Sequence, residues 1–231
     1  MVYTHLFFDA DGTLFDFNTS EKKALEKAMR VLCGTWKNDF VQLYHQINKG
    51  AWKELEKKLI TLDELKILRF RRFMEQTGLV FDPAEMSRVY TGFLALSNDM
   101  LPGVLPLLKE LSQKYTLVLV TNGITEVQMG RIKATDTEKY FKAIVISEEV
   151  GVAKPDPAFF QIASRRCGNP AKENILMIGD SMTSDMRGAA NYGIASCLIV
   201  PPHKEVPVPG ADDPKPDFII RNFDQLKEIL R

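Results

Sequence analysis

Apolar stretches of strand length recur through the second half of the chain. They are YTLVLVT at 115–121, AIVIS at 143–147, NILMIGD at 174–180, ASCLIV at 195–200 and DFII at 217–220. Apolar residues run through each stretch without strict alternation, which is typical of strands that are covered on both faces. The stretches between them have helical periodicity and supply that cover. Together with a first strand in FFDAD at 7–11, the pattern predicts an α/β fold with a doubly wound parallel sheet.

The segment from 19 to 96 has a different pattern. Apolar residues recur there at spacings of three and four, with few strand signals, and predict four amphipathic helices. These helices lie in EKKALEKAMRVL at 21–32, DFVQLYHQINKGAWKEL at 39–55, TLDELKILRFRRFMEQTG at 61–78 and DPAEMSRVYTGFLALS at 82–97. Thr61 and Glu64 predict a capping box, and Asp82 followed by Pro83 predicts another helix start. An all-helical segment is therefore inserted after the first strand.

Polar residues stand where several of the predicted strands end. They are Asp9, Asp11, Thr121, Asn122, Ser147 and Asp180. Ligands of open parallel sheets bind outside the carboxyl ends of the strands, so we expect these side chains to line one crevice. With Asp185 added, four acids gather there, and their mutual repulsion is unfavourable without a cation. Mg²⁺ is the expected ion, because it prefers carboxylates, water and phosphate oxygens.

Donors suited to an anion are predicted opposite these acids. Lys154 lies in a loop after a strand, in GVAKPDP, and Thr121-Asn122-Gly123 offers a hydroxyl, an amide and backbone N–H groups at a helix entrance. Taken singly, each motif also suits an ordinary structural role, since Asp-Gly and Thr-Asn-Gly are frequent in turns. Their joint occurrence in order, each at a strand end, favours metal-dependent phosphoryl transfer.

Composition and charge argue against several classes of partner. Lys+Arg and Asp+Glu number 30 each, so no excess of positive charge favours a nucleic acid polymer or an anionic membrane. No apolar run approaches the roughly 20 residues of a membrane span, and we expect neither a signal peptide nor an anchor. Three widely separated cysteines are typical of reduced thiols and favour a cytoplasmic location. The sequence leaves the oligomeric state open.

Four short motifs resemble the four signature motifs of the haloacid dehalogenase superfamily, and the resemblance extends over essentially the whole chain. In chain order they are DADGT at 9–13, TN at 121–122, Lys154 in VAKPDP and GDSMTSD at 179–185. Members with a helical insertion after the first motif carry a mobile cap over a Rossmann-like core. The resemblance implies a cap at 17–97 and a core made of 1–16 and 98–231.

The resemblance implies a chemical role for each motif residue. Asp9 would be the nucleophile that forms an aspartyl-phosphate, and Asp11 would protonate the leaving oxygen and later take a proton from water. Thr121 and the backbone around Asn122 would hold the phosphoryl group, and Lys154 would neutralise its charge.

A Mg²⁺ site is implied by the same motifs. The Asp180 carboxylate, the Asp9 carboxylate and the Asp11 backbone carbonyl would bind the ion, and Asp185 would support them. Asp11 also separates branches of the superfamily, because the dehalogenases attack carbon, need no metal and lack an acid at this position. Its presence favours a phosphohydrolase or a phosphomutase.

A narrower resemblance is to the bacterial pyrimidine 5′-nucleotidases that act on nonstandard nucleoside monophosphates. It rests on YHQINKGAWKELEKKLITLDELKILRF at 44–70, VTNGITEVQMGRI at 120–132, VISEEVGVAKPDP at 145–157 and PPHKE at 201–205. Gly12 is a departure, since those nucleotidases are expected to carry an acid there. The implied partner is a small phosphate ester, a nucleoside monophosphate.

Substrate contacts are expected near the mouth of the cap. Phe15 and Phe17 follow the first motif, while Tyr44, Asn48 and Trp52 share one helical stripe at four-residue spacing. Of these, Phe15, Asn48 and Trp52 are the candidates for contact with a base. Aromatic residues at helical spacing more often belong to a core, so packing is the competing interpretation.

Two further segments carry weaker expectations. The proline-rich segment 200–217 predicts an extended surface loop, in which His203 is placed to reach the rim of the site. The arginines at 69, 71 and 72 predict a solvated helix face.

Two other functions remain open at this point. A sugar-phosphate phosphatase or a phosphoglucomutase-type enzyme would use the same scaffold. A phospho-accepting receiver module, which is not an enzyme, also combines acids, threonine and lysine on a parallel sheet, but such a module is much shorter and has no inserted helices.

Overall fold

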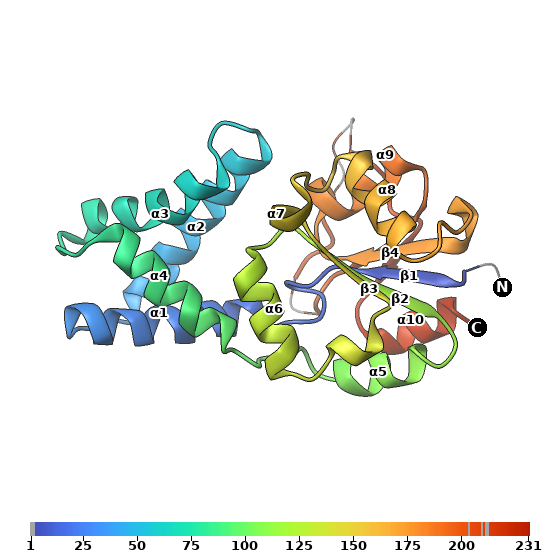
Figure 1. Cartoon of the computed structure of the whole chain (residues 1–231), viewed down its shortest axis with the longest axis horizontal. Coiled ribbons are helices and arrows are strands. Elements are labelled where there is room, and N and C mark those ends of the chain that lie inside the picture. Colours follow the sequence, from blue (N-terminus) through green and yellow to red (C-terminus); the bar gives the residue numbers. More distant parts are fainter. Residues whose placement is uncertain (1–2, 203, 209, 211–212) are drawn as a thin grey trace.

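The computed structural model describes residues 3–202, 204–208, 210 and 213–231, and its centre is a six-stranded parallel sheet (Figure 1). The strands are β1 His5–Phe8, β2 Thr116–Thr121, β3 Ala143–Ile146, β4 Ile175–Gly179, β5 Ala195–Ile199 and β6 Phe218–Ile220. Their order across the sheet is β3-β2-β1-β4-β5-β6. The predicted α/β fold with a doubly wound parallel sheet is confirmed, although β1 ends at Phe8, before the two acids.

Helices cover both faces of this sheet. Side chains alternate between the two faces along each strand, so each strand has apolar side chains on both faces for helices to cover. Leu6 and Phe8 pack into a core on one face with α5 (Val104–Leu111) and α10 (Phe223–Ile229). Phe7 packs on the other face with α8 (Pro157–Arg166) and α9 (Arg187–Tyr192), and Figure 1 shows these two pairs of helices on opposite sides of the sheet.

The chain reverses direction across the sheet at β1, which places a crevice at its centre. β1 pairs with β2 on one side and with β4 on the other, and both pairings are parallel. The carboxyl ends of three central strands therefore meet at one edge of the sheet, where ligands bind in folds of this kind. The α6 helix (Thr125–Ala134) begins at this edge, directly after β2.

Four helices between β1 and α5 form a second group, whose core continues to Ile124 and Val127 at the start of α6. They are α1 Phe17–Cys33, α2 Asp39–Glu56, α3 Leu62–Thr77 and α4 Pro83–Ala95. Their core is aromatic, with Tyr44 and Phe70 stacked 5.1 Å apart between ring centroids. The capping box of Thr61 and Glu64 is present, as is the Asp82 cap, so the four predicted helices are confirmed. Figure 1 shows this group standing beside the sheet, with α4 next to α6.

Short helices complete the connections. They are the α-helix α7 Ser147–Val150, the 3₁₀ turns Glu138–Tyr140 and Lys172–Asn174, and a π-helical turn at Met182–Met186. Ser147, expected at a strand end, is the first residue of α7. His203 lies outside the described residues. None of the helices in the described part of the chain is long and apolar enough to cross a bilayer.

Candidate active site

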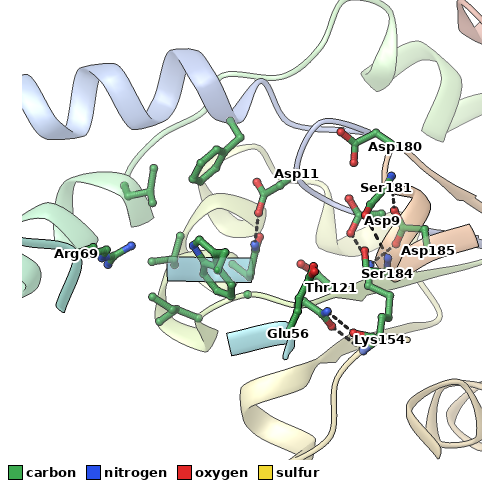
Figure 2. Close-up of a pocket in the computed structure, with 18 residues that line it drawn as sticks. Asp9, Asp11, Glu56, Arg69, Thr121, Lys154, Asp180, Ser181, Ser184 and Asp185 are labelled. Atoms are coloured by element: carbon green, nitrogen blue, oxygen red, sulfur yellow. Dashed lines mark hydrogen bonds and ion pairs between the residues drawn. The ribbon is translucent and has the colours of Figure 1, made fainter. Parts of the chain in front are cut away.

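The motif residues meet at the carboxyl edge of the sheet (Figure 2). Asp9 follows β1, Thr121 ends β2, Asp180 follows β4, and Lys154 reaches the same place from the loop beyond α7. All four line one cavity, together with Asn122, Gly123, Asp11 and Asp185. The sheet thus brings together side chains that are far apart in the sequence.

Lys154 lies at the centre of the charged groups. Its Nζ donates to Asp9 Oδ1 at 2.6 Å, to Asp185 Oδ1 at 2.7 Å and to the Val120 carbonyl at 2.8 Å. The side chain is buried, with 2% of the residue exposed. Burial alone would lower the pKa of Lys154, but the carboxylates of Asp185 and Asp9 outweigh it and the pKa is raised. The amine is therefore held as a cation against two acids.

Asp9, Asp180 and Asp185 form a compact acidic cluster. One oxygen atom from each carboxylate lies within 4.8 Å of the other two. Burial, followed by repulsion from its acidic neighbours, raises the pKa of Asp9 well above its ordinary value, although Lys154 opposes the rise. Burial and repulsion by Asp185 raise the pKa of Asp180 to about 7. Three carboxylates face one lysine, so the cluster carries excess negative charge, and its possible ligand atoms are all oxygen. Both features fit a hard divalent cation.

Asp11 is held apart from this cluster by residues of α6. Its Oδ2 accepts a hydrogen bond of 2.7 Å from Gln128 Nε2, and its Oδ1 pairs with the guanidinium of Arg131. Arg131 is fully buried and lies 4.2 Å from the centroid of the Phe15 ring. The second acid of the DADGT motif is therefore fixed by an ion pair and by a hydrogen bond of its own, and Figure 2 shows the hydrogen bond.

Asn122 joins two of the loops that build the site. Its Nδ2 donates to the Lys154 carbonyl at 2.7 Å, and its Oδ1 accepts from the Lys154 backbone N–H at 2.8 Å. The side chain predicted to bind substrate thus fixes the backbone at Lys154. Asn122 still lines the cavity, beside Thr121.

Two glycines are required by close approach. Gly12 has a φ of 84°, and a Cβ there would lie 2.4 Å from the Asp180 carboxylate, so any larger residue would strain the backbone and displace that carboxylate. Gly123 lines the cavity, and a Cβ on it would lie 2.5 Å from Gln128 Nε2. Because Gln128 is buried and bonded to Asp11, it has no room to move away.

The four-helix group supplies the opposite wall of the cavity. Trp52 and Glu56 come from α2, Arg69 from α3, and Phe17 and Leu94 from α1 and α4. Trp52 was a predicted substrate contact, and its place in the wall suits that role. Burial raises the pKa of Glu56, which accepts a hydrogen bond of 3.4 Å from Thr183 in the turn Met182–Met186.

Two predicted substrate contacts lie elsewhere. Phe15 is 1% exposed and packs in the core under the sheet edge, because the chain turns inward after the DADGT loop. Asn48 is 2% exposed, with its amide bonded to Glu21 and Arg69. Neither residue lines the cavity, contrary to the expectation for both.

Several cavity and supporting residues were not predicted as such. Arg69, expected on a solvated face, is instead buried. A signal existed for it, since Leu65, Arg69 and Phe73 follow one another at four-residue spacing and all three face the core of the group. Gln128 and Arg131 likewise share the buried face of α6, and a buried polar pair at such spacing predicts a partner like Asp11.

Comparison with known proteins decides the family. The sequence model of the family of haloacid dehalogenase-like hydrolases matches residues 3–193. The chain belongs to this family. The predicted superfamily is thereby confirmed, and the receiver-module alternative is excluded. As a haloacid dehalogenase-like hydrolase the chain is an enzyme, and hydrolases of this family generally use Mg²⁺, which fits the acidic cluster.

Relatives match over the full length of the chain. Pyrimidine 5′-nucleotidase YjjG of Escherichia coli is 31% identical over 230 residues, covering 100% of this chain and 99% of its own. Pyrimidine 5′-nucleotidase PynA of Streptococcus pneumoniae is 35% identical, covering 100% of this chain and 96% of its own. The crystal structure of the HAD-hydrolase YfnB of Bacillus subtilis, bound to magnesium, has a TM-score of 0.92 at 30% identity and covers 100% of both chains. The narrower resemblance to pyrimidine 5′-nucleotidases is therefore confirmed.

Proposed function

We propose that this hydrolase is a Mg²⁺-dependent phosphomonoesterase, a 5′-nucleotidase that prefers pyrimidine nucleoside monophosphates. The observation that carries the proposal is the Lys154 bridge between Asp9 and Asp185 at one end of a cavity whose other walls are largely apolar. A charged end suits a phosphoryl group and an apolar body suits a flat base. The two nucleotidase relatives support the substrate class.

Asp9 acts as the nucleophile in this proposal. Lys154 binds its Oδ1, which favours the ionised carboxylate against the cost of burial and directs attack to Oδ2. Attack on phosphorus forms an aspartyl-phosphate and breaks the bond to the ester oxygen. Water then attacks the phosphoryl group and restores Asp9, so that one difficult displacement becomes two easier ones.

Asp11 moves the protons. It lies two residues from Asp9 on the same wall of the cavity and is oriented by Gln128 and Arg131. It donates a proton to the leaving ester oxygen in the first step and accepts one from water in the second. The Thr121 hydroxyl and the backbone N–H groups that follow it orient the phosphoryl oxygens.

Asp9 and Asp180, with the Asp11 carbonyl, hold the Mg²⁺ ion in this proposal, and Asp185 supports them. The ion, when bound, neutralises phosphoryl charge and aligns the group for displacement. The oxygen-only donor set and its excess negative charge support the assignment, as does bound magnesium in the YfnB structure.

Residues 17–97 serve as a mobile cap over a core made of 1–16 and 98–231. The aromatic core shared by α1–α4 supports this division, and the group contacts the rest of the chain through Ile124 and Val127 of the α6 segment. The YfnB structure is described as revealing interdomain movement, which supports the same behaviour here. The proposal also places the enzyme in the cytoplasm, because Cys33, Cys167 and Cys197 are all free thiols.

Phosphate release from a substrate panel tests the proposal. The panel contains UMP, dUMP, dTMP, AMP, ribose 5-phosphate and glucose 6-phosphate, each assayed with Mg²⁺ and with a chelator. We expect metal-dependent release that is strongest for the pyrimidine nucleotides. Stronger release from the sugar phosphates would favour the sugar-phosphate phosphatase instead, and release that survives chelation would contradict the metal requirement.

A further inference from the structure

Arg69 lies in the cavity wall at the end away from the acidic cluster (Figure 2). It comes from α3 and is 2% exposed, so its positive charge is almost wholly removed from bulk water. Asp9, Lys154 and the other charged residues of the phosphoryl site gather at the opposite end. Charge buried at such a place requires a partner, because an unpaired buried cation is costly.

Only part of the Arg69 guanidinium has a hydrogen-bond partner. Its Nη1 donates to Asn48 Oδ1 at 3.2 Å. Its Nε and Nη2 are buried and have no hydrogen-bond partner within the described part of the chain. These two nitrogen atoms form one edge of the planar group, and their parallel N–H bonds make the fork that pairs with two acceptors or brackets one oxygen. The unused fork belongs to a residue of the cavity wall.

The surroundings of Arg69 hold it in place. Asn48, which binds Nη1, donates to Glu21 Oε1 at 2.7 Å, and the other oxygen of Glu21 pairs with His45 Nδ1 at 2.8 Å. The rings of Phe70 and Tyr90 lie 5.2 and 5.0 Å from the guanidinium carbon. The Nη1 side of the guanidinium is therefore held by a hydrogen-bond network, while its Nε and Nη2 atoms have no partner in the described part of the chain.

We infer that Arg69 is a specificity-determining residue whose Nε–H and Nη2–H both donate to one carbonyl oxygen of a pyrimidine base. The inference rests on the proposed nucleotidase function and names the part of the substrate that this site reads. A second phosphate or a carboxylate would also pair with the fork. Phe17, Trp52 and Leu94 also line this cavity and instead favour a flat apolar ring that carries carbonyl oxygens.

The matched pair Arg69→Met and Arg71→Met tests this role. Arg71 is on the same helix but exposed, so its substitution controls for loss of charge from α3. The substrates are UMP and ribose 5-phosphate, which differ in the base alone. Loss of a hydrogen bond to a charged group weakens binding by roughly 10- to 100-fold, so Arg69→Met should lower kcat/KM for UMP about 10- to 100-fold. Ribose 5-phosphate hydrolysis should change less than about twofold, and Arg71→Met should alter neither.

Sulfur-substituted substrates test the same contact on the unaltered enzyme, so the inference does not depend on a folded variant. Sulfur accepts hydrogen bonds weakly, and 2-thio-UMP or 4-thio-UMP should therefore lose kcat/KM relative to UMP. That loss should disappear in Arg69→Met and persist in Arg71→Met. Normal use of both thio substrates by the unaltered enzyme would overturn the contact.

The failures of the two proposals give different results. An equal loss for UMP and ribose 5-phosphate in Arg69→Met would make Arg69 a packing residue, while the nucleotidase function would stand. An unaltered enzyme that prefers ribose 5-phosphate to UMP would overturn the nucleotidase function itself, before any variant is compared.

Discussion

At the scale of single residues, the central feature is one lysine shared by two buried carboxylates. Lys154 contacts Asp9 and Asp185 and is held by a loop that Asn122 fixes through two hydrogen bonds. The sequence predicted these residues from their order along the strand ends. It could not predict which acid pairs with which donor, because that depends on side-chain directions set by the whole sheet. Asp11 illustrates this, since its partners come from α6.

Replacing Lys154 tests this shared contact. Lys154→Met leaves Asp9 and Asp185 buried and repelling each other, so the free energy of unfolding should fall by about 3–5 kcal/mol, and turnover should be lost. Urea denaturation in a chelator measures the first effect, with no cation present to replace the amine. Lys114→Met, at an exposed position, is the control and should change stability by less than about 0.5 kcal/mol. A stability as high as that of the control would contradict the bridge.

The pair of His45 and Glu21 gives a dependence on pH. The hydrogen bond to Glu21 raises the pKa of His45 in the folded protein, while partial burial and the nearby charges of Lys49 and Lys204 oppose the rise. The pair therefore stabilises the fold fully below the ordinary histidine pKa of about 6.5, and this contribution is lost as pH rises through the raised value. His45→Gln should lower the Tm at pH 5.5 and have little effect at pH 8.5. The effect is small, under about 1 kcal/mol, because the imidazole is partly exposed. A Tm difference that grows with pH would contradict this assignment.

At the scale of elements, the described strands and the four helices of the cap follow the sequence pattern closely. The wrong expectations for single residues also came from this pattern, because periodicity shows which face of a helix is buried but not which residues that face contacts. Arg69 occupies the buried stripe of α3, and its charge led to the wrong expectation of a solvated face. Phe15 was expected in the cavity and is in the core instead, since β1 ends earlier than predicted and the chain then turns inward.

The α2 helix carries the cap residue that the sequence placed correctly at the cavity. Trp52→Ala should lower kcat/KM for UMP more than for p-nitrophenyl phosphate, because only the nucleotide extends past the phosphoryl site to this side chain. We expect a loss of about fivefold for UMP, equivalent to one aromatic contact of roughly 1 kcal/mol. Trp36→Ala is the matched control, because this tryptophan packs against Phe40 within the cap. Equal losses on both substrates would make Trp52 a packing residue.

At the scale of the whole molecule, the cavity lies where the four-helix group α1–α4 meets the edge of the sheet. The core supplies charge for the phosphoryl group, and α1–α4 supply Phe17, Trp52 and Arg69. An ion pair of 2.8 Å between Lys66 of α3 and Glu148 of α7 also crosses from the cap to the core. The relation between the two parts depends on contacts between segments far apart in the sequence, so periodicity alone could not give it.

The covalent intermediate is the most direct test of the account. UMP labelled in its phosphate is mixed with excess enzyme and Mg²⁺, and the reaction is stopped with acid within milliseconds. We predict that label appears on the unaltered protein before free phosphate accumulates, and that Asp9→Asn, with an unchanged Tm, carries none. Release of free phosphate with no labelled protein at any time, or label retained by Asp9→Asn, would contradict Asp9 as the nucleophile.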